Sequence, residues 1–132
     1  MKVMLDTNTC IFLIREDPRI IPHESAVDCC ISTIVAGELE YGYRNSDRRP
    51  ENRARLDVLL RHVAIVEVNV DVAVQWGDLK VAMKRAMIGP NDLWIAAHAL
   101  ALNLPLVTNN TREFARVPGL IIDDWLEDDS AC

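Results

Sequence analysis

Short apolar segments alternate along this chain with longer segments whose apolar residues recur at helical spacing. The helical spacing is clear in 51–62, where Leu56, Leu59 and Leu60 repeat every three or four residues. The strand-like segments are 2–5, 27–31, 65–68, 105–108 and 120–122. The helical segments are 10–14, 32–43, 51–62, 71–87, 91–102 and 111–114, with Ser32 and Thr111 as N-caps. This alternation predicts an α/β fold whose central parallel sheet is flanked by helices on both faces.

Length and composition are those of one globular domain. The chain has 132 residues, of which 50% are hydrophobic and 26% are charged. We expect a single domain over 1–126 and a short acidic C-terminal tail at 127–132. No apolar run approaches the roughly 20 residues that cross a bilayer, and the N-terminus lacks a signal-peptide pattern. The four cysteines lack the spacing of a zinc site. We therefore expect a cytoplasmic protein with no membrane partner.

Three acidic residues occupy positions where a carboxylate is costly unless something compensates its charge. Asp6 directly ends the first strand, Glu38 lies in the helix after the second strand, and Asp92 lies in the first turn of the helix after Gly89-Pro90. Open α/β sheets carry their ligand crevice at the carboxyl ends of the strands. Thr108 also follows a strand, so we expect it at the same edge. Topology thus predicts that these side chains converge.

Gathered carboxylates repel one another, and a hard divalent cation removes that conflict. Mg²⁺ prefers oxygen ligands and keeps several waters, and Mn²⁺ is a possible substitute. Water on such a cation is a better nucleophile, and the cation stabilises charge on a phosphoryl oxygen. The constellation is therefore suited to hydrolysis of a phosphodiester bond.

Several motifs, in this order along nearly the whole chain, resemble the PIN-domain ribonuclease toxins of the VapC type, including the tRNA-cleaving subgroup. The motifs are MLDTN at 4–8, ELEYG at 38–42, GPND at 89–92 with IAAHA at 95–99, VTNN at 107–110, and REF at 112–114 leading to VPGL at 117–120 and DW at 124–125. The resemblance implies the PIN-domain fold and a Mg²⁺-dependent endoribonuclease of a type II toxin–antitoxin system. It also implies a VapB-type antitoxin, a homodimer, a toxin–antitoxin hetero-oligomer, and cleavage in the anticodon loop of initiator tRNA.

The same resemblance assigns roles to individual residues. Asp6 and Asp92 would be the direct metal ligands, and Glu38 would bind a metal-bound water or a second cation. Supporting roles would fall to Thr7, Asn8 and Thr108. The fourth acidic position of many PIN domains falls on Asn110, a neutral amide, and Glu113 one turn later is the residue that could supply the missing charge. We expect the antitoxin to offer a basic side chain or an apolar helix to the acidic crevice.

The net charge of −6 is unusual for a nucleic-acid binder, so the distribution of charge matters. The segment 44–61 holds six arginines against three acids. Arg44, Arg48 and Arg49 are either candidate contacts to an RNA backbone or part of a solvated helix face.

Two other functions remain open. A phosphatase of the haloacid dehalogenase kind also places an Asp after its first strand, but it needs a second Asp where Asn8 stands. A non-catalytic PIN-like module that only binds protein or RNA is the other alternative, and Asn110 is its best support.

Overall fold

The computed structural model of the chain describes residues 1–126, and the expected acidic tail lies outside the described residues. Its elements are β1 (Val3–Leu5), α1 (Thr7–Ile14), the 3₁₀ turn η1 (Ala26–Asp28), β2 (Cys29–Ser32), α2 (Thr33–Arg44), α3 (Arg49–His62), β3 (Ala64–Val66), α4 (Val70–Ala82), α5 (Pro90–Leu102), β4 (Leu106–Val107), α6 (Thr111–Phe114) and β5 (Ile122–Asp123). The strands form one sheet in the order β3-β2-β1-β4-β5, and every neighbouring pair is parallel. The predicted α/β fold is confirmed.

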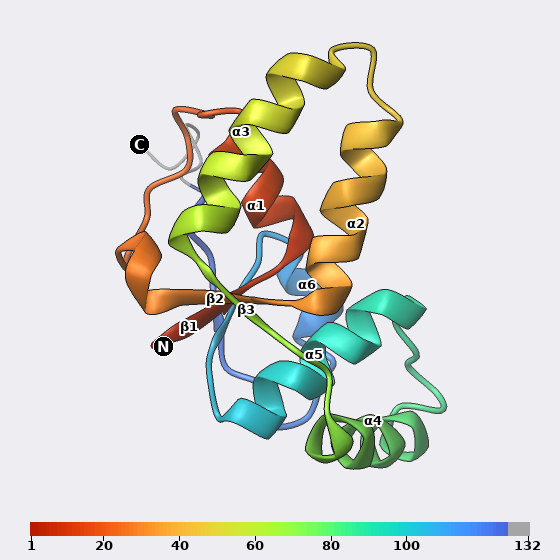
Figure 1. Ribbon diagram of the computed structural model, residues 1–132. Helices are drawn as coiled ribbons and strands as arrows, with labels where there is room; N and C mark the ends of the chain where they lie inside the picture. The colour runs from red at the N-terminus through yellow and green to blue at the C-terminus, as the bar shows by residue number, and fades with distance from the viewer. Residues whose placement is uncertain (127–132) are drawn as a thin grey trace.

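Helices cover both faces of this sheet, as predicted. Figure 1 shows α1, α2 and α3 on one side and α4 and α5 on the other, and α4 packs closely along α5. Because both faces are covered, β1, β2 and β4 are buried at every residue, including the adjacent Cys29 and Cys30. None of the helices within 1–126 is long and apolar enough to span a membrane.

Some element boundaries differ from the sequence prediction. Helix α1 begins at Thr7 rather than near Cys10, because the side chain of Asp6 caps it. Residues 26–28 form a 3₁₀ turn before β2 instead of extending the strand.

The turn between α4 and α5 accounts for another difference. Helix α4 ends at Ala82, five residues before the predicted end at Met87. The chain then turns so that Ile88 is buried and α5 starts at Pro90. Proline disfavours a helical conformation at the preceding residue, and Gly89 is extended, with φ −56° and ψ 150°. The turn delivers Gly89-Pro90 to the carboxyl edge of the sheet.

Candidate active site at the carboxyl edge of the sheet

Asp6 ends β1 and is almost fully buried, with 4% of its surface exposed. Its backbone N–H donates to the carbonyl oxygen of Val107 on β4, at 3.0 Å. Its Oδ1 accepts the backbone N–H of Thr9 at 2.8 Å, which is the cap of α1. Burial raises the pKa of Asp6, the hydrogen bonds from Thr108 and Thr9 oppose that rise, and the negative charge of Glu38 adds to it. A buried carboxylate in this condition is a ready partner for a cation.

Glu38 reaches the same place from α2. The side chain of Ser32, the last residue of β2, caps α2 by accepting the backbone N–H of Ile34 at 3.1 Å. Glu38 then lies in the second turn, half-buried, and its Oε1 accepts the hydroxyl of Thr7 at 2.6 Å. Since Thr7 directly follows Asp6, this hydrogen bond ties the two carboxylates to neighbouring positions.

Asp92, in the first turn of α5, carries the largest electrostatic perturbation of the site. Its pKa is raised to about 7, chiefly by burial, then by the negative charge of Glu113 and a hydrogen bond between the two carboxyl groups. Glu38 and Asp6 contribute smaller repulsions. The three predicted acids therefore come from three separate elements into electrostatic contact with one another.

Glu113, on α6, is held against Asp92 by two donors. Its Oε1 accepts the backbone N–H of Gly89 at 3.0 Å, and its Oε2 accepts the side-chain amide of Asn110 at 2.5 Å. These hydrogen bonds lower the pKa of Glu113. A Cβ added at Gly89 would lie 3.6 Å from Oδ2 of Asp92 and 3.8 Å from Oε1 of Glu113, so both carboxyl groups border that glycine. The pair therefore favours a proton on Asp92 next to the carboxylate of Glu113.

Of the residues predicted to support the site, Thr108 is buried and hydrogen-bonded to it, whereas Asn8 is not. Thr108 is fully buried and bonds both to Asp6 and, as an acceptor at 3.0 Å, to the backbone N–H of Asn110. Asn8 is exposed, and its side chain makes no hydrogen bond within the described part of the chain. Thr9, which the sequence analysis did not single out, is buried and also donates its hydroxyl to Val107, at 3.2 Å. The signal was available, because Thr9 lies three residues after a strand-end Asp, where a capped helix presents its N–H.

Asn110 does not cap α6 as its position at the helix start would allow. Its side chain makes no capping hydrogen bond and instead donates to Glu113. Thr111 is the first residue of α6, so its predicted role as the N-cap is wrong. The amide is therefore used to hold a carboxylate in the site.

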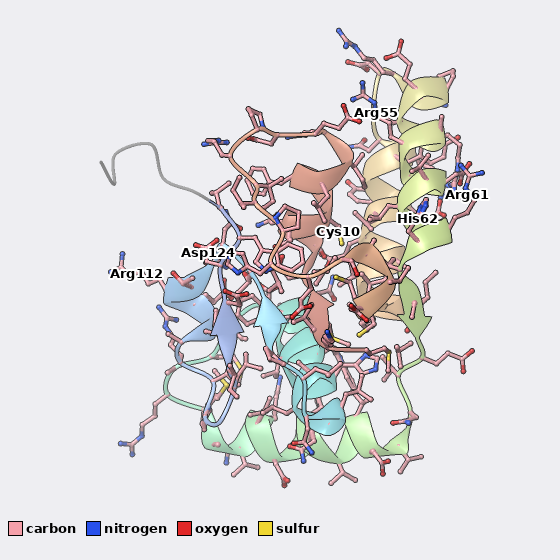
Figure 2. All side chains as sticks on the ribbon, turned by 90° about the vertical axis from the view of Figure 1, so that its left-hand side faces the viewer. Cys10, Arg55, Arg61, His62, Arg112 and Asp124 are labelled. Carbon is pink, nitrogen blue, oxygen red and sulfur yellow. The ribbon has the colours of Figure 1, made fainter. Side chains whose placement is uncertain are left out.

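The arginines expected to contact RNA lie along the α2–α3 hairpin. Arg44 bonds the carboxylate of Glu40 at 2.5 Å, whereas Arg48 and Arg49 are exposed near the hairpin turn. Arg112 is also exposed and neighbours Glu113 on α6. Figure 2 shows Arg112 beside α6, well separated from Arg61 on α3. Arg112 therefore offers a basic side chain directly next in sequence to Glu113, a member of the acidic cluster.

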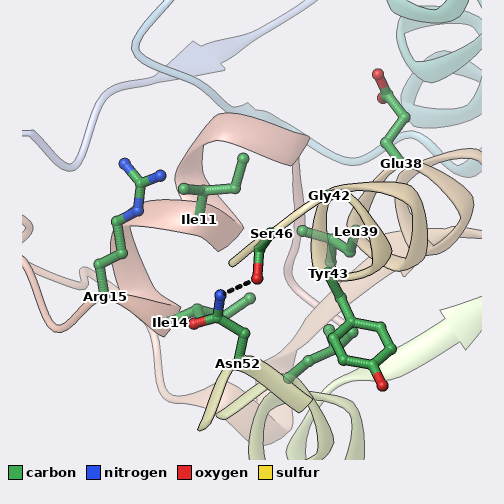
Figure 3. Close-up of a pocket in the computed structure, with 10 residues that line it drawn as sticks. Ile11, Ile14, Arg15, Glu38, Leu39, Gly42, Tyr43, Ser46 and Asn52 are labelled. Carbon is green, nitrogen blue, oxygen red and sulfur yellow. Dashed lines mark hydrogen bonds between the residues drawn. The ribbon is translucent and has the colours of Figure 1, made fainter. Parts of the chain in front are cut away.

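An apolar groove of about 150 Å³ opens beside the acidic cluster, between α1, α2 and α3. Its apolar lining comes from Ile11, Ile14, Leu39 and Leu56, and polar atoms come from Arg15, Ser46 and Asn52. Figure 3 shows Glu38 at one end of the groove with its carboxylate directed away from it. Glu38 thus lies at one end of the groove and, through its hydrogen bond with Thr7, next to Asp6.

The donor set fits a hard cation held largely through water. Within residues 1–126, no three His, Cys, Asp or Glu side chains lie in an arrangement that could hold a metal ion as they stand. Mg²⁺ needs only one or two carboxylates, since it keeps several waters. The repulsion among Asp6, Glu38 and Asp92, together with the burial of Asp6, is the condition that such a cation relieves.

Comparison with known proteins agrees with this geometry. The family model described as "PIN domain" matches residues 3–120. The chain is 37% identical to Ribonuclease VapC2 of Rickettsia felis, over 95% of this chain and 98% of that protein. It is 38% identical to tRNA(fMet)-specific endonuclease VapC of Salmonella typhimurium, again over 95% of this chain and 98% of that protein.

Two solved structures are also similar to this chain over nearly its whole length. VapBC2 from Rickettsia felis, bound to a DNA fragment from its promoter, matches with a TM-score of 0.82 and 35% identity, over 95% of this chain and 99% of that chain. The Salmonella typhimurium VapBC structure bound to DNA matches with a TM-score of 0.83 and 34% identity, over 95% of this chain and 98% of that chain. This chain belongs to the VapC group of the PIN-domain family.

Proposed function

We propose that this protein is a metal-dependent endoribonuclease that acts as the toxin of a type II toxin–antitoxin system. The observation that carries the proposal is the convergence of Asp6, Glu38 and Asp92, from three separate elements, at the carboxyl edge of the sheet. A surface that only binds a partner gains nothing from converging carboxylates, or from the raised pKa values of Asp6 and Asp92. The VapC relatives named as ribonucleases support the same function.

Each side chain has a role that its contacts suit. Mg²⁺ or Mn²⁺ at this edge would polarise a phosphoryl oxygen and make a bound water more acidic. Asp6 and Asp92 would ligate the cation. Glu38, with one oxygen fixed by the hydroxyl of Thr7, would orient the attacking water and take up its proton. Thr108 would keep the carboxylate of Asp6 ionised by donating to it.

Glu113 is the fourth acid in this proposal, in place of the neutral Asn110. Its carboxylate borders Asp92, so it adds the negative charge that an amide cannot provide. Asn110 then acts as a positioning residue, because its amide donates to Glu113 at 2.5 Å. The support that Asn110 lent to a non-catalytic module is thereby removed. The phosphatase alternative also weakens, since the exposed Asn8 is a neutral amide where that chemistry needs a second acid.

We propose initiator tRNA, cut in its anticodon loop in the cytoplasm, as the substrate. The name of the Salmonella typhimurium relative, tRNA(fMet)-specific endonuclease, supports this choice. Loops present unstacked nucleotides whose backbone a shallow crevice can reach. Arg48 and Arg49 remain candidate phosphate contacts, whereas Arg44 would first have to leave Glu40.

A VapB-type antitoxin is the proposed protein partner, and solved relatives are VapBC structures. We propose that an apolar helix of the antitoxin occupies the groove between α1, α2 and α3. From there, a basic side chain would reach the acidic cluster past Glu38. This arrangement would neutralise the acids and exclude RNA in one step.

Cleavage of initiator tRNA by the full chain, purified free of antitoxin, tests the proposal. We expect cuts in the anticodon loop with Mg²⁺ and none with EDTA. The variants Asp6→Asn and Asp92→Asn should lose activity by at least about 100-fold while remaining folded. The matched control Asp47→Asn, at an exposed acid outside the site, should cut normally. Cleavage that persists in EDTA, or in both Asp variants, would overturn the proposal. Phosphate trapped covalently on Asp6 would favour the phosphatase instead.

A further inference from the structure

The chain has two tyrosines, both on α2, and only one of them has a structural role within the described residues. Tyr43 lines the groove between α1, α2 and α3 (Figure 3), and the guanidinium groups of Arg44 and Arg53 lie 5.6 and 5.0 Å from the centre of its ring. Tyr41 is 68% exposed, and its side chain makes no hydrogen bond or ring contact among residues 1–126. The packing of the fold therefore does not account for an aromatic side chain at this position.

Helix geometry places Tyr41 next to the acidic cluster. Tyr41 follows Glu38 by three residues, so the two side chains are neighbours on one side of α2. Side chains on a helix lean towards its N-terminus, which directs the ring of Tyr41 over the turn that holds Glu38. Glu38 bonds to Thr7, which directly follows Asp6, and α2 also packs against α5, the helix that carries Asp92. An aromatic ring thus borders the proposed site of phosphodiester cleavage.

A glycine leaves the turn beside this ring open. Gly37 precedes Tyr41 by four residues, on the same side of the helix, and is itself exposed. A Cβ built on Gly37 would meet no atom within 4 Å, so no other part of the described chain fills the space beside it. A planar group therefore has room to approach the ring without displacing protein atoms.

We propose that Tyr41 stacks on an unpaired nucleobase of the RNA, next to the phosphate held at the acidic cluster. This inference rests on the proposed function and adds a base-binding residue to it. The net charge of −6 and the gathered acids repel an RNA backbone, so affinity near the site has to come from the cation and from uncharged contacts. Stacking on an aromatic ring is such a contact, and it accepts any base because every base has a π face. Tyr41 therefore selects single-stranded RNA, whose bases are free to turn outwards.

The surroundings of Tyr41 favour a nucleobase over a protein partner. The groove that we assign to the antitoxin is lined from α2 by Leu39 and Tyr43 among others, and Tyr41 is outside that lining. Its neighbours in the next turn are Arg44 and Asn45, both exposed, so no apolar patch surrounds the ring. The centre of a protein interface is apolar, whereas a base needs one ring for its face and polar groups for its edges.

Kinetics on a hairpin with the anticodon stem and loop of initiator tRNA measure the contribution of the ring, with the full chain free of antitoxin and Mg²⁺ present. Tyr41→Ala should raise KM by about 10-fold and change kcat by less than about two-fold, because the bound substrate and the transition state both make this contact. Tyr41→Phe keeps the ring and should recover the lost affinity. The matched control Ile121→Ala removes a side chain that is 67% exposed before β5, at the opposite edge of the sheet, and should change neither constant. Circular dichroism checks that all variants fold.

Abasic substitution identifies the base that stacks. Each nucleotide beside the cut is replaced in turn by an abasic residue, and the loss of kcat/KM is compared between the wild type and Tyr41→Ala. One substitution should cost the wild type about 10-fold and the variant little, because the ring that this base would meet is already absent. An unchanged KM in Tyr41→Ala, or equal losses in both proteins at every position, would overturn the inference. A Tyr41→Ala variant that cuts normally but binds the antitoxin more weakly would assign the residue to the protein partner instead.

A binding experiment separates this inference from the proposed function. Glu38→Gln removes the proposed base and leaves Asp6 and Asp92 in place, so RNA should bind to this variant uncut. A fluorescent adenine analogue, placed at each loop position in turn, reports stacking by the quenching of its emission. Quenching at one position that disappears when Tyr41→Ala is added supports the inference, even if the wild type fails to cut RNA. Cleavage by the wild type with no quenching that depends on Tyr41 retains the proposed function and refutes the stacking.

Discussion

Replacement of Asp92 by Asn should make the metal-free protein more stable above neutral pH. Burial and the neighbouring Glu113 raise the pKa of Asp92 from 3.8 to about 7. The folded state therefore holds a proton on this pair that the unfolded state has already lost. Folding stability from this group is fully present below about pH 4, declines as pH rises towards 7, and stays lost above that value.

The size of the effect follows from the same numbers. A difference of about three pH units corresponds to ~4 kcal/mol for a group that bears the whole shift. Asp92 is only half-buried, and part of its shift comes from Glu113, whose own pKa is lowered, so roughly half of that, about 2 kcal/mol, is a reasonable expectation. Asn keeps the shape of the protonated side chain and can still donate to Glu113. The variant should therefore match the wild type near pH 4 and exceed it by about 2 kcal/mol at pH 8.

Urea denaturation followed by circular dichroism, in EDTA between pH 4 and pH 8, measures this difference. The comparison of variant with wild type cancels the titration of all other groups. The control Asp47→Asn removes an exposed acid and should show no such trend. Parallel pH curves for Asp92→Asn and the wild type would refute the reasoning, and so would a variant less stable than the wild type at pH 8.

Three further outcomes are expected. Thr7→Val removes the hydroxyl that fixes Glu38, so kcat for tRNA cleavage should fall about 10-fold while Mg²⁺ affinity, measured by titration calorimetry, is unchanged. Ser32→Ala removes the cap of α2 and should lower the free energy of unfolding by about 1 kcal/mol in urea titrations. Arg112→Ala should weaken tRNA binding and reduce the slope of log affinity against log salt by about 1, whereas Arg61→Ala on α3 should change neither.

The order of elements could be predicted from the sequence because each strand is a short apolar run. β1, β2 and β4 are buried throughout, so their sequences contain few polar interruptions. The position of Asp6 followed from the same pattern, since a charged residue directly after a buried strand must lie at the sheet edge. Burial of neighbouring strands in one parallel sheet then brings Thr108 to that edge.

Contacts that depend on loop geometry could not be predicted. Glu113 was named from the sequence as a source of charge, but its pairing with Asp92 depends on the turn before α5, which places the N–H of Gly89 on Glu113. That turn also ends α4 at Ala82, although apolar residues continue to Met87. Helical spacing reports which residues face the core and carries little information about where the chain leaves the helix.

Asp6 has a structural role apart from its proposed binding of a cation, and this second role has an evolutionary consequence. Oδ1 caps α1 by accepting the N–H of Thr9, a duty that the amide oxygen of Asn performs equally well. A change of Asp6 to Asn would thus abolish cation binding while sparing the helix and the groove beside it. If the proposed pairing with an antitoxin holds, a single substitution turns the toxin into a harmless decoy that still sequesters its inhibitor.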